Sequence, residues 1–178
     1  MAGGGAAPAA REVRGVGAVI FVTVGTHHQP FQRLLDALTD LDGAELTVQY
    51  GRGKPPPAVA RAVPYMPFDE MMRCFRETDV AITHAGVGSI LCARREGHVP
   101  LVVPRRHEFG EHVDEHQAEL TRALAQRGVV VAVWDTAKLA ELVATAPPRR
   151  KWVDAVDPSL ATEVRAALGG STAQINPA

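Results

Sequence analysis

Three things that this 178-residue chain lacks exclude several classes of protein. Its two cysteines, Cys74 and Cys92, fall in predicted helices without the spacing of metal ligands, so we expect reduced thiols and no disulfide framework. The formal net charge of -1 gives no bulk electrostatic case for binding nucleic acid. No apolar run reaches the roughly 18 residues that a membrane-spanning helix needs. These absences favour a cytoplasmic protein that would reach the inner face of a membrane only through a partner.

The hydrophobic content of 46% is enough to bury a core, and the length suits one domain. The Gly/Ala-rich start lacks the charged beginning and apolar core of a signal peptide, so we expect residues 1–15 to be a disordered lead-in. Residues 16–147 carry the pattern of the folded domain. The pattern weakens from Pro147 on, and we expect 148–178 to be a tail that packs on the domain or on a partner, with one more short helix over Asp157 to Leu168.

Apolar runs and amphipathic segments alternate about six times along the chain. The predicted strands are Val16–Val24, Leu46–Tyr50, Ala62–Val63, Val80–Thr83, Leu101–Val103 and Val129–Val133. The predicted helices begin at Pro30, run over Phe68–Phe75, follow Gly86, run from about His112 to Arg127, and follow a capping Asp135. This alternation predicts an α/β fold with an open, mostly parallel sheet flanked by helices. In such sheets ligands bind outside the carboxyl ends of the strands.

The clearest candidate site is the turn after the strand at Val80–Thr83. That strand runs into His84, and the small residues Gly86, Gly88 and Ser89 then lead into a helix. The first N–H groups of a helix lack intrahelical partners and the helix dipole favours negative charge, so the turn predicts an anion site. An imidazole and a hydroxyl can donate to phosphate oxygens, and glycines let a ligand approach the backbone. An ordinary tight turn with a partly buried histidine would have the same sequence.

A second glycine turn, Gly25 and Thr26, follows the first predicted strand. It would lie at the same edge of the sheet and face a ligand from the neighbouring strand. Taken alone, it equally fits an ordinary strand-to-helix connection. The adjacent His27 and His28 fit exposed loop residues without a role.

The charged segment after Pro104 is harder to assign. We interpret Arg105 to Glu111 as solvated surface, with a lid or a partner contact as the alternative. Polar side chains over 114–117 could bind a polyhydroxyl ligand at the start of the following helix, or could form an ordinary acidic first turn. The segment also contains His-Val-Asp-Glu-His, the pattern of inverted zinc peptidases. On a helix, His112 and His116 would share a face, and Glu141 could be a third ligand, but so short a match arises easily by chance.

Four blocks of sequence, in order, resemble one enzyme family. They are Phe21 to Thr26, Ile82 to Ile90, Pro100 to Pro104, and Glu111 to Leu120. Over about Val19 to Val133 the chain resembles the C-terminal, donor-binding half of GT-B glycosyltransferases of the family 28 type. The small free-standing members are the most similar: the sugar-nucleotide subunit of the two-part N-acetylglucosaminyltransferase of dolichol-linked glycan synthesis, and bacterial exopolysaccharide glycosyltransferase subunits. The resemblance implies a Rossmann-like sheet, that is, a single GT-B C-terminal half.

The resemblance also implies roles for individual residues. The donor diphosphate would be held by His84, Gly86, Gly88 and Ser89, with an electrostatic role for His84 and no catalytic residue identified. The uracil base would lie by Val63 to Phe68, which includes Met66. The remaining donor contacts would be Gly25 and Thr26 across the cleft, and His116 and Gln117 on sugar hydroxyls. Many relatives have a ribose-binding glutamate where this chain has Cys92, and a thiol is a poor substitute for a carboxylate.

The function implied is that of a UDP-sugar-binding subunit of a two-component inverting glycosyltransferase, which transfers a hexose to a lipid-linked or polysaccharide acceptor. A membrane-anchored subunit would bind the acceptor, no metal or other cofactor is expected, and a homo-oligomer is left open. Two alternatives remain. One is a non-catalytic nucleotide-binding or interaction module, which Cys92 favours. The other is a zinc hydrolase that uses His112 and His116.

Overall fold

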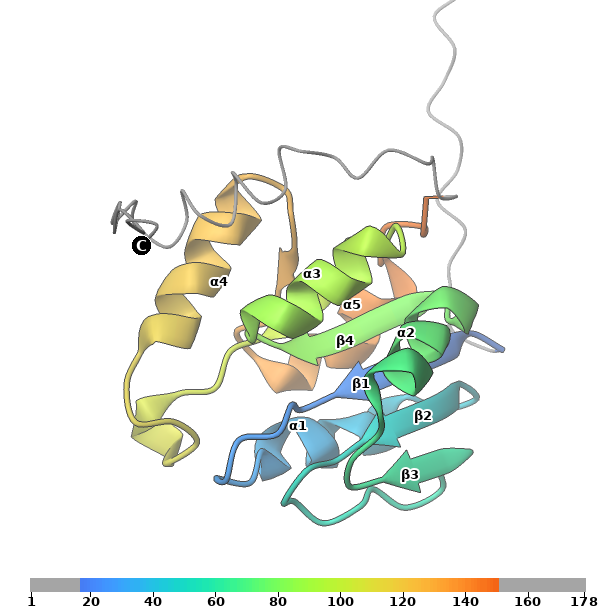
Figure 1. Ribbon diagram of the computed structural model, residues 1–178, viewed down its shortest axis with the longest axis horizontal. Helices are drawn as coiled ribbons and strands as arrows, with labels where there is room; N and C mark the ends of the chain where they lie inside the picture. The colour runs from blue at the N-terminus through green and yellow to red at the C-terminus, as the bar shows by residue number, and fades with distance from the viewer. Residues whose placement is uncertain (1–16, 151–178) are drawn as a thin grey trace, which may run out of the picture.

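The computed structural model describes residues 17–150, which form one open sheet with helices on both faces (Figure 1). Its strands are β1 (Val19–Thr23), β2 (Glu45–Gln49), β3 (Arg61–Val63), β4 (Val80–His84), β5 (Leu101–Val103) and β6 (Val131–Ala132). The strand order is β3-β2-β1-β4-β5-β6, and every neighbouring pair is parallel. This is the doubly wound, Rossmann-like topology, in which the chain order reverses between β1 and β4.

Five α-helices and three short 3-10 helices connect or follow these strands. The α-helices are α1 (Gln32–Ala37), α2 (Phe68–Glu77), α3 (Val87–Arg95), α4 (His116–Gln126) and α5 (Leu139–Ala144). The 3-10 helices are Leu38–Asp40, His107–Phe109 and Thr136–Lys138, and the Asp135 side chain caps the last of these. Helices α1 and α5 pack on one face of the sheet, and α2, α3 and α4 on the other (Figure 1). None of the described helices is both long and apolar enough to cross a membrane.

The burial of β1 on both faces explains its unbroken apolar sequence. Ile20 and Val22 point toward the α1–α5 layer. Phe21 points the opposite way and meets Phe75 of α2 edge-on, with ring centroids 4.8 Å apart. Alternate residues of a strand face opposite sides, so a central strand of a two-sided sheet must be apolar throughout.

All six predicted strands are present, with shifts at their ends. The strand predicted over Val129–Val133 is reduced to β6, because Val129 and Val130 instead pack with α3 and α4 before pairing with β5 begins. Pro30 does not start a helix as predicted, since α1 begins at Gln32. The lead-in expected at 1–15 and the helix expected at 157–168 lie outside the described residues.

The prediction that a helix begins at about His112 is wrong, because α4 begins at His116. Side-chain bonds hold the preceding residues in a loop. The Asp114 carboxylate accepts from the His116 backbone N–H at 3.1 Å. The Glu115 carboxylate accepts from the His107 backbone N–H at 2.9 Å. These two bonds hold residues 112–115 in a loop, so the helix begins about one turn later than the residue pattern suggested.

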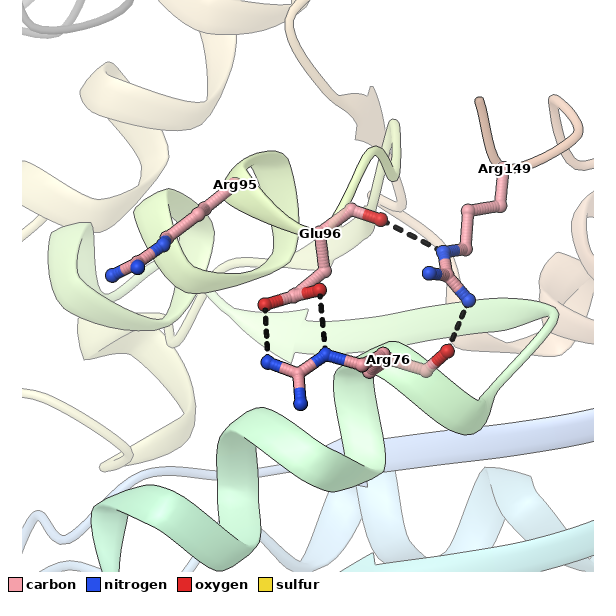
Figure 2. Close-up of a pocket in the computed structure, with 4 residues that line it drawn as sticks. All are labelled: Arg76, Arg95, Glu96 and Arg149. Atoms are coloured by element: carbon pink, nitrogen blue, oxygen red, sulfur yellow. Dashed lines mark hydrogen bonds and ion pairs between the residues drawn. The ribbon is translucent and has the colours of Figure 1, made fainter. Parts of the chain in front are cut away.

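The end of the described chain is clamped across two helices, as Figure 2 shows. The Arg149 guanidinium donates to the backbone oxygens of Glu96, just after α3, and Arg76, in the last turn of α2. The Arg76 guanidinium in turn forms two hydrogen bonds with the buried Glu96 carboxylate, at 3.2 and 3.4 Å. These groups and Arg95 line a cavity of about 330 Å³. Arg76 and Arg149 thus bind the ends of α2 and α3, whose last carbonyls lack intrahelical partners.

Candidate functional site

The candidate site lies where the winding of the sheet reverses. β1 and β4 run side by side with Thr23 paired to Thr83, so the residues that follow each strand emerge together at the carboxyl edge. A cavity of about 250 Å³ opens there. It is lined by Thr23, Gly25, Thr26, Gln49, Tyr65, Met66, Phe68, Met71, His84 and Ser89. Ligands of doubly wound sheets bind in this crevice.

Six of the ten residues predicted to bind a donor line this one cavity. They are Gly25, Thr26, Met66, Phe68, His84 and Ser89. Gly86 and Gly88 belong to the adjoining turn and helix start and do not line it themselves. His116 and Gln117 lie at the start of α4 and are also outside the cavity lining.

Two glycines leave the space that the His84 ring fills. A Cβ atom on Gly25 would lie 2.5 Å from the ring atoms Cε1 and Nε2, and one on Gly86 would lie 2.2 Å from Nε2. Gly25 also has a φ of +75°, which favours glycine. The Gly25 N–H donates to the Thr23 hydroxyl at 3.2 Å, and that hydroxyl donates to Gln49 at 2.9 Å. The turn after β1 is therefore anchored to the sheet and packed directly on the imidazole.

The surroundings of His84 hold its imidazole in the neutral form. Burial lowers the pKa of His84 to about 4, and the positive charge of Arg105 contributes, against a smaller opposing effect from the Thr23 backbone. The Nδ1 atom is buried without a well-formed hydrogen bond to any described residue. At neutral pH this ring can donate one hydrogen bond and accept another.

The start of α3 supplies the remaining polar groups. Gly86 is the N-cap, and Ile90 is the first residue whose N–H reaches back to the Gly86 carbonyl, at 3.0 Å. Helix geometry leaves the N–H groups of residues 87–89 without intrahelical acceptors. The hydroxyl-bearing Ser89 lines the cavity beside them. Together with the helix dipole, these donors make the turn suitable for an anion.

Aromatic side chains flank the cavity on the β3 side. Tyr65 is 64% exposed and Phe68 57%, whereas Met66 beside them is buried. Exposed aromatic faces next to a polar pocket suit a planar ring system such as a nucleobase. Cys92 lies elsewhere: it packs with the cluster of Phe21 and Phe75, and burial raises the pKa of its thiol. The thiol therefore stays protonated and contributes no charge to the site.

The interpretation of the segment after Pro104 as solvated surface is wrong for its two ends. Arg105 and Glu111 are both buried, at 1% and 4% exposure. The Glu111 carboxylate forms two hydrogen bonds with Arg33, at 2.9 and 3.0 Å, and accepts one from the Arg106 backbone. Only the stretch between, around the 3-10 helix His107–Phe109, is exposed. A stretch of mixed charges in the sequence does not indicate which of its side chains will be buried.

Gln117 acts within the protein. Its Oε1 atom accepts from the Arg105 backbone N–H at 3.0 Å and so ties α4 to the end of β5. The neighbouring His116 has an exposed side chain, 79% accessible, near the Asp114 carboxylate. Both residues remain candidates for contact with a sugar that extends beyond the cavity.

Three histidine rings stack on one another, two from the loop after β1 (His27 and His28) and one from the loop before α4 (His112). The His27 ring lies 4.4 Å from that of His28 and 4.9 Å from that of His112, between centroids. Burial and the neighbouring positive groups lower the pKa of His27. His27 and His112 are half-buried, whereas His28 is exposed. The expectation of exposed loop residues is thus confirmed for His28 and wrong for His27.

The zinc alternative loses its geometric basis. His112 precedes α4 whereas His116 begins it, so the two do not share a helix face. The His112 Nδ1 atom bonds the Asp114 carboxylate at 2.9 Å. Over residues 17–150, no group of three histidine, cysteine or carboxylate side chains is placed to hold a metal ion.

Comparison with known proteins agrees with the fold. The sequence model of one family, described as the glycosyltransferase family 28 C-terminal domain, matches residues 19–151. A search of curated proteins finds no match. Among solved structures, the glycosyltransferase SnogD from Streptomyces nogalater is similar with a TM-score of 0.50 and 21% identity, over 94% of this chain and 43% of that one. At this identity the likeness concerns the fold alone.

Two further solved structures are similar at lower scores. CalG4, the calicheamicin glycosyltransferase, has a TM-score of 0.48 and 19% identity, over 88% of this chain and 40% of its own. The glycotransferase of kitacinnamycin has a TM-score of 0.46 and 19% identity, over 93% and 40%. This chain spans about two fifths of the length of these three proteins.

Proposed function

The chain belongs to the family of glycosyltransferase family 28 C-terminal domains, and from this premise we propose that it is the donor-binding subunit of a two-component, inverting glycosyltransferase. The donor would be a UDP-sugar, the transferred group a hexose, and the acceptor a lipid-linked saccharide or a polysaccharide. One observation carries the proposal: a neutral imidazole, a serine hydroxyl and the open start of α3 meet at one cavity at the winding reversal of the sheet.

These groups suit a diphosphate both before and after the sugar leaves. The N–H groups of residues 87–89 and the hydroxyl of Ser89 would donate to the phosphate oxygens. His84 would donate from one ring nitrogen, and a nearby dianion would raise its pKa and favour proton uptake. Charge that develops on the departing UDP would then meet donors that are already in place, which is electrostatic catalysis. Tyr65 and Phe68 would flank the uracil base.

The matched family model is that of a C-terminal domain, so the proposal assigns the acceptor-binding half to a second component. Among the exposed large apolar side chains of the described residues, Tyr65 and Phe68 line the cavity itself. A partner that closes over the cavity would shield these two side chains from water.

A non-catalytic nucleotide-binding module remains the second candidate. It is favoured by Cys92, which packs into the core where many relatives carry a ribose-binding glutamate. The two proposals differ in activity, and a transfer assay separates them. We expect little or no turnover by the isolated chain, and turnover when it is co-expressed with a membrane-anchored acceptor-binding partner. Robust turnover by the isolated chain would contradict the two-component proposal.

Calorimetric titration with UDP and a panel of UDP-sugars tests donor binding directly. We expect His84→Ala to weaken UDP binding by about 1.5–3 kcal/mol, because a hydrogen bond to a charged phosphate is lost. His107→Ala removes an exposed histidine outside the cavity and should leave the affinity unchanged. Absence of UDP binding by the unmodified chain, or equal affinities of the two variants, would refute the proposed role of the cavity.

A further inference from the structure

Arg105 is the largest fully buried side chain among the residues that the structure describes, with 1% exposure. Burial lowers the pKa of Arg105 to about 10, so the guanidinium still carries its charge at neutral pH. A buried charge costs several kcal/mol unless hydrogen bonds and nearby charges compensate it. Its bonding partners therefore indicate what the side chain does.

The Arg105 guanidinium bonds backbone carbonyls on both sides of the turn after β1. Its Nη2 atom donates to Val24 at 2.9 Å. Its Nη1 atom donates to Gln29 at 2.9 Å, and more weakly to Pro30 at 3.4 Å. One planar, rigid group thus joins the residues directly before and after the segment 25–28. It works as a brace across this segment, which an apolar side chain or a lysine amine could not reproduce.

Two further contacts fix the guanidinium itself. It also donates to the Glu111 backbone oxygen, at 3.2 Å, and its centre lies 4.6 Å from the middle of the Phe31 ring. The Arg105 backbone N–H is held by Gln117. The brace is therefore connected to α1, to the loop before α4 and to α4 itself.

The braced turn is the wall of the anion site. Gly25 and Thr26 line the cavity, and the Gly25 backbone leaves no room for a Cβ atom beside the His84 ring. A displacement of the turn would therefore move two lining residues and would free the imidazole. The charge of Arg105 also acts on the site, because it disfavours protonation of His84 and of His27 and adds positive potential where an anion would bind.

We infer that Arg105 is a positioning residue for diphosphate binding: without touching the ligand, its guanidinium holds the turn over 25–28 against the His84 ring. The inference rests on the proposed function for the identity of the ligand. It assigns to a buried arginine behind the site a share of the affinity for UDP.

The experiment compares Arg105→Met and Arg105→Lys with a matched control, Arg33→Met. Arg33 belongs to the same charged network, but its hydrogen bonds within residues 17–150 go to Glu111 and the Pro104 carbonyl and not to the segment 25–28. UDP affinity is measured by calorimetry, and the Gly25 and Thr26 amide signals are followed by NMR. We expect Arg105→Met to lower UDP affinity by at least about tenfold and to shift both amide signals, because the turn is misplaced.

Arg105→Lys keeps the positive charge but lacks the planar guanidinium with its several N–H donors, so we expect an intermediate loss of UDP affinity. If Arg105→Met does not fold, Arg105→Lys provides the test instead. Arg33→Met should change the UDP affinity by less than about twofold. A further readout separates positioning from a general loss of stability. The pKa of His84, followed by NMR, should rise toward its ordinary value in Arg105→Met and stay low in Arg33→Met.

Folded Arg105 variants with unchanged UDP affinity and unchanged Gly25 and Thr26 signals would overturn the inference. An equal loss of affinity in the Arg33 control would also overturn it, because the effect would then belong to the whole loop network. If the unmodified chain binds no UDP, the proposed function fails by itself. The amide shifts and the His84 titration would still show whether Arg105 braces the turn.

Discussion

At the residue scale, the site depends on small residues that leave room for one imidazole. Gly25 and Gly86 lie against the His84 ring from two different turns. Gly86 has an ordinary φ of -81°, so its backbone would accept any residue, and only the missing side chain matters there. Gly88, two residues later, faces open space. Two glycines of one short motif therefore serve different purposes.

This difference predicts opposite effects of the same substitution. Gly86→Ala should lower the free energy of unfolding by about 1–3 kcal/mol and weaken UDP binding, because the new methyl group displaces the His84 ring. Gly88→Ala should raise the free energy of unfolding by about 0.5–1 kcal/mol, since alanine replaces glycine in a helix without a clash. Urea denaturation of the two variants measures both changes. Equal stabilities would show that the imidazole adapts freely.

The sequence was least informative about which individual side chains are buried and what they bond. The turn around His84 was found because strand, glycines and helix start are contiguous in the chain. The role of Arg105 was not predicted, because its partners lie in the loop after β1 and in the segment before α4, up to 81 residues away. A buried arginine and a solvated one look alike within a charged stretch. Only its surroundings distinguish them.

At the scale of elements, helix ends decide how the layers are joined. α2 and α3 end side by side, and the Arg149 guanidinium binds a carbonyl at each end (Figure 2). The adjacent Arg150 pairs its backbone with Gly97, where its N–H donates at 3.0 Å, but its side chain is exposed. The two arginines therefore form a matched pair in which only one side chain acts as a clamp.

We predict that Arg149→Met lowers the free energy of unfolding by about 1–2 kcal/mol, because two carbonyls at helix ends lose their donor. Arg150→Met removes the same charge and should change it by less than about 0.5 kcal/mol. Thermal or urea denaturation of the two variants gives the comparison. The clamp would have no stabilising role if both variants matched the unmodified chain.

Element boundaries were predictable where apolar periodicity ends at a glycine, as at Gly97 after α3. The start of α4 was not, because the Asp114 carboxylate forms a local turn with the His116 N–H and the Glu115 carboxylate bonds the N–H of His107 in the preceding loop. The same displacement separates His112 from His116. The apparent zinc motif required His112 and His116 on one helix, but residues 112–115 form a loop in the folded chain.

At the scale of the whole molecule, the buried neutral histidines link stability to pH. The pKa of His84 is about 4 in the folded chain, against an ordinary value of 6.5 for an unfolded one. The pKa of His98, buried and bonded to the Phe75 carbonyl, is lowered as well. The unfolded chain therefore binds more protons at mildly acidic pH. Stability is complete above pH 6.5 and is lost as the pH falls toward 4.

From His84 alone we expect a loss of up to about 3 kcal/mol across this range. Urea denaturation between pH 7.5 and 4.5 measures the slope. His84→Gln should flatten it by removing one of the two buried groups, and His107→Gln, at an exposed position, should not. A bound diphosphate should oppose the loss, because it favours protonated His84. A slope that is equal in all three chains would exclude His84 as its source.

The residue pattern was sufficient to predict the α/β class, the six strands and a mostly parallel sheet, and it indicated the carboxyl edge as the place of a candidate site. Those features follow from local patterns: β-branched apolar runs, helical periodicity, and glycine turns next to strand ends. The resemblance of four blocks to one family was likewise a property of contiguous residues, and the family match over residues 19–151 confirms it.

Burial and charge state, by contrast, are set only by folding. Folding turns Arg105 inward beneath the β1 turn and holds the His84 imidazole neutral. These outcomes depend on burial and on distances between residues that are remote in sequence. The type of a residue does not fix its pKa or its bonding partners, because both depend on the neighbours that folding brings to it.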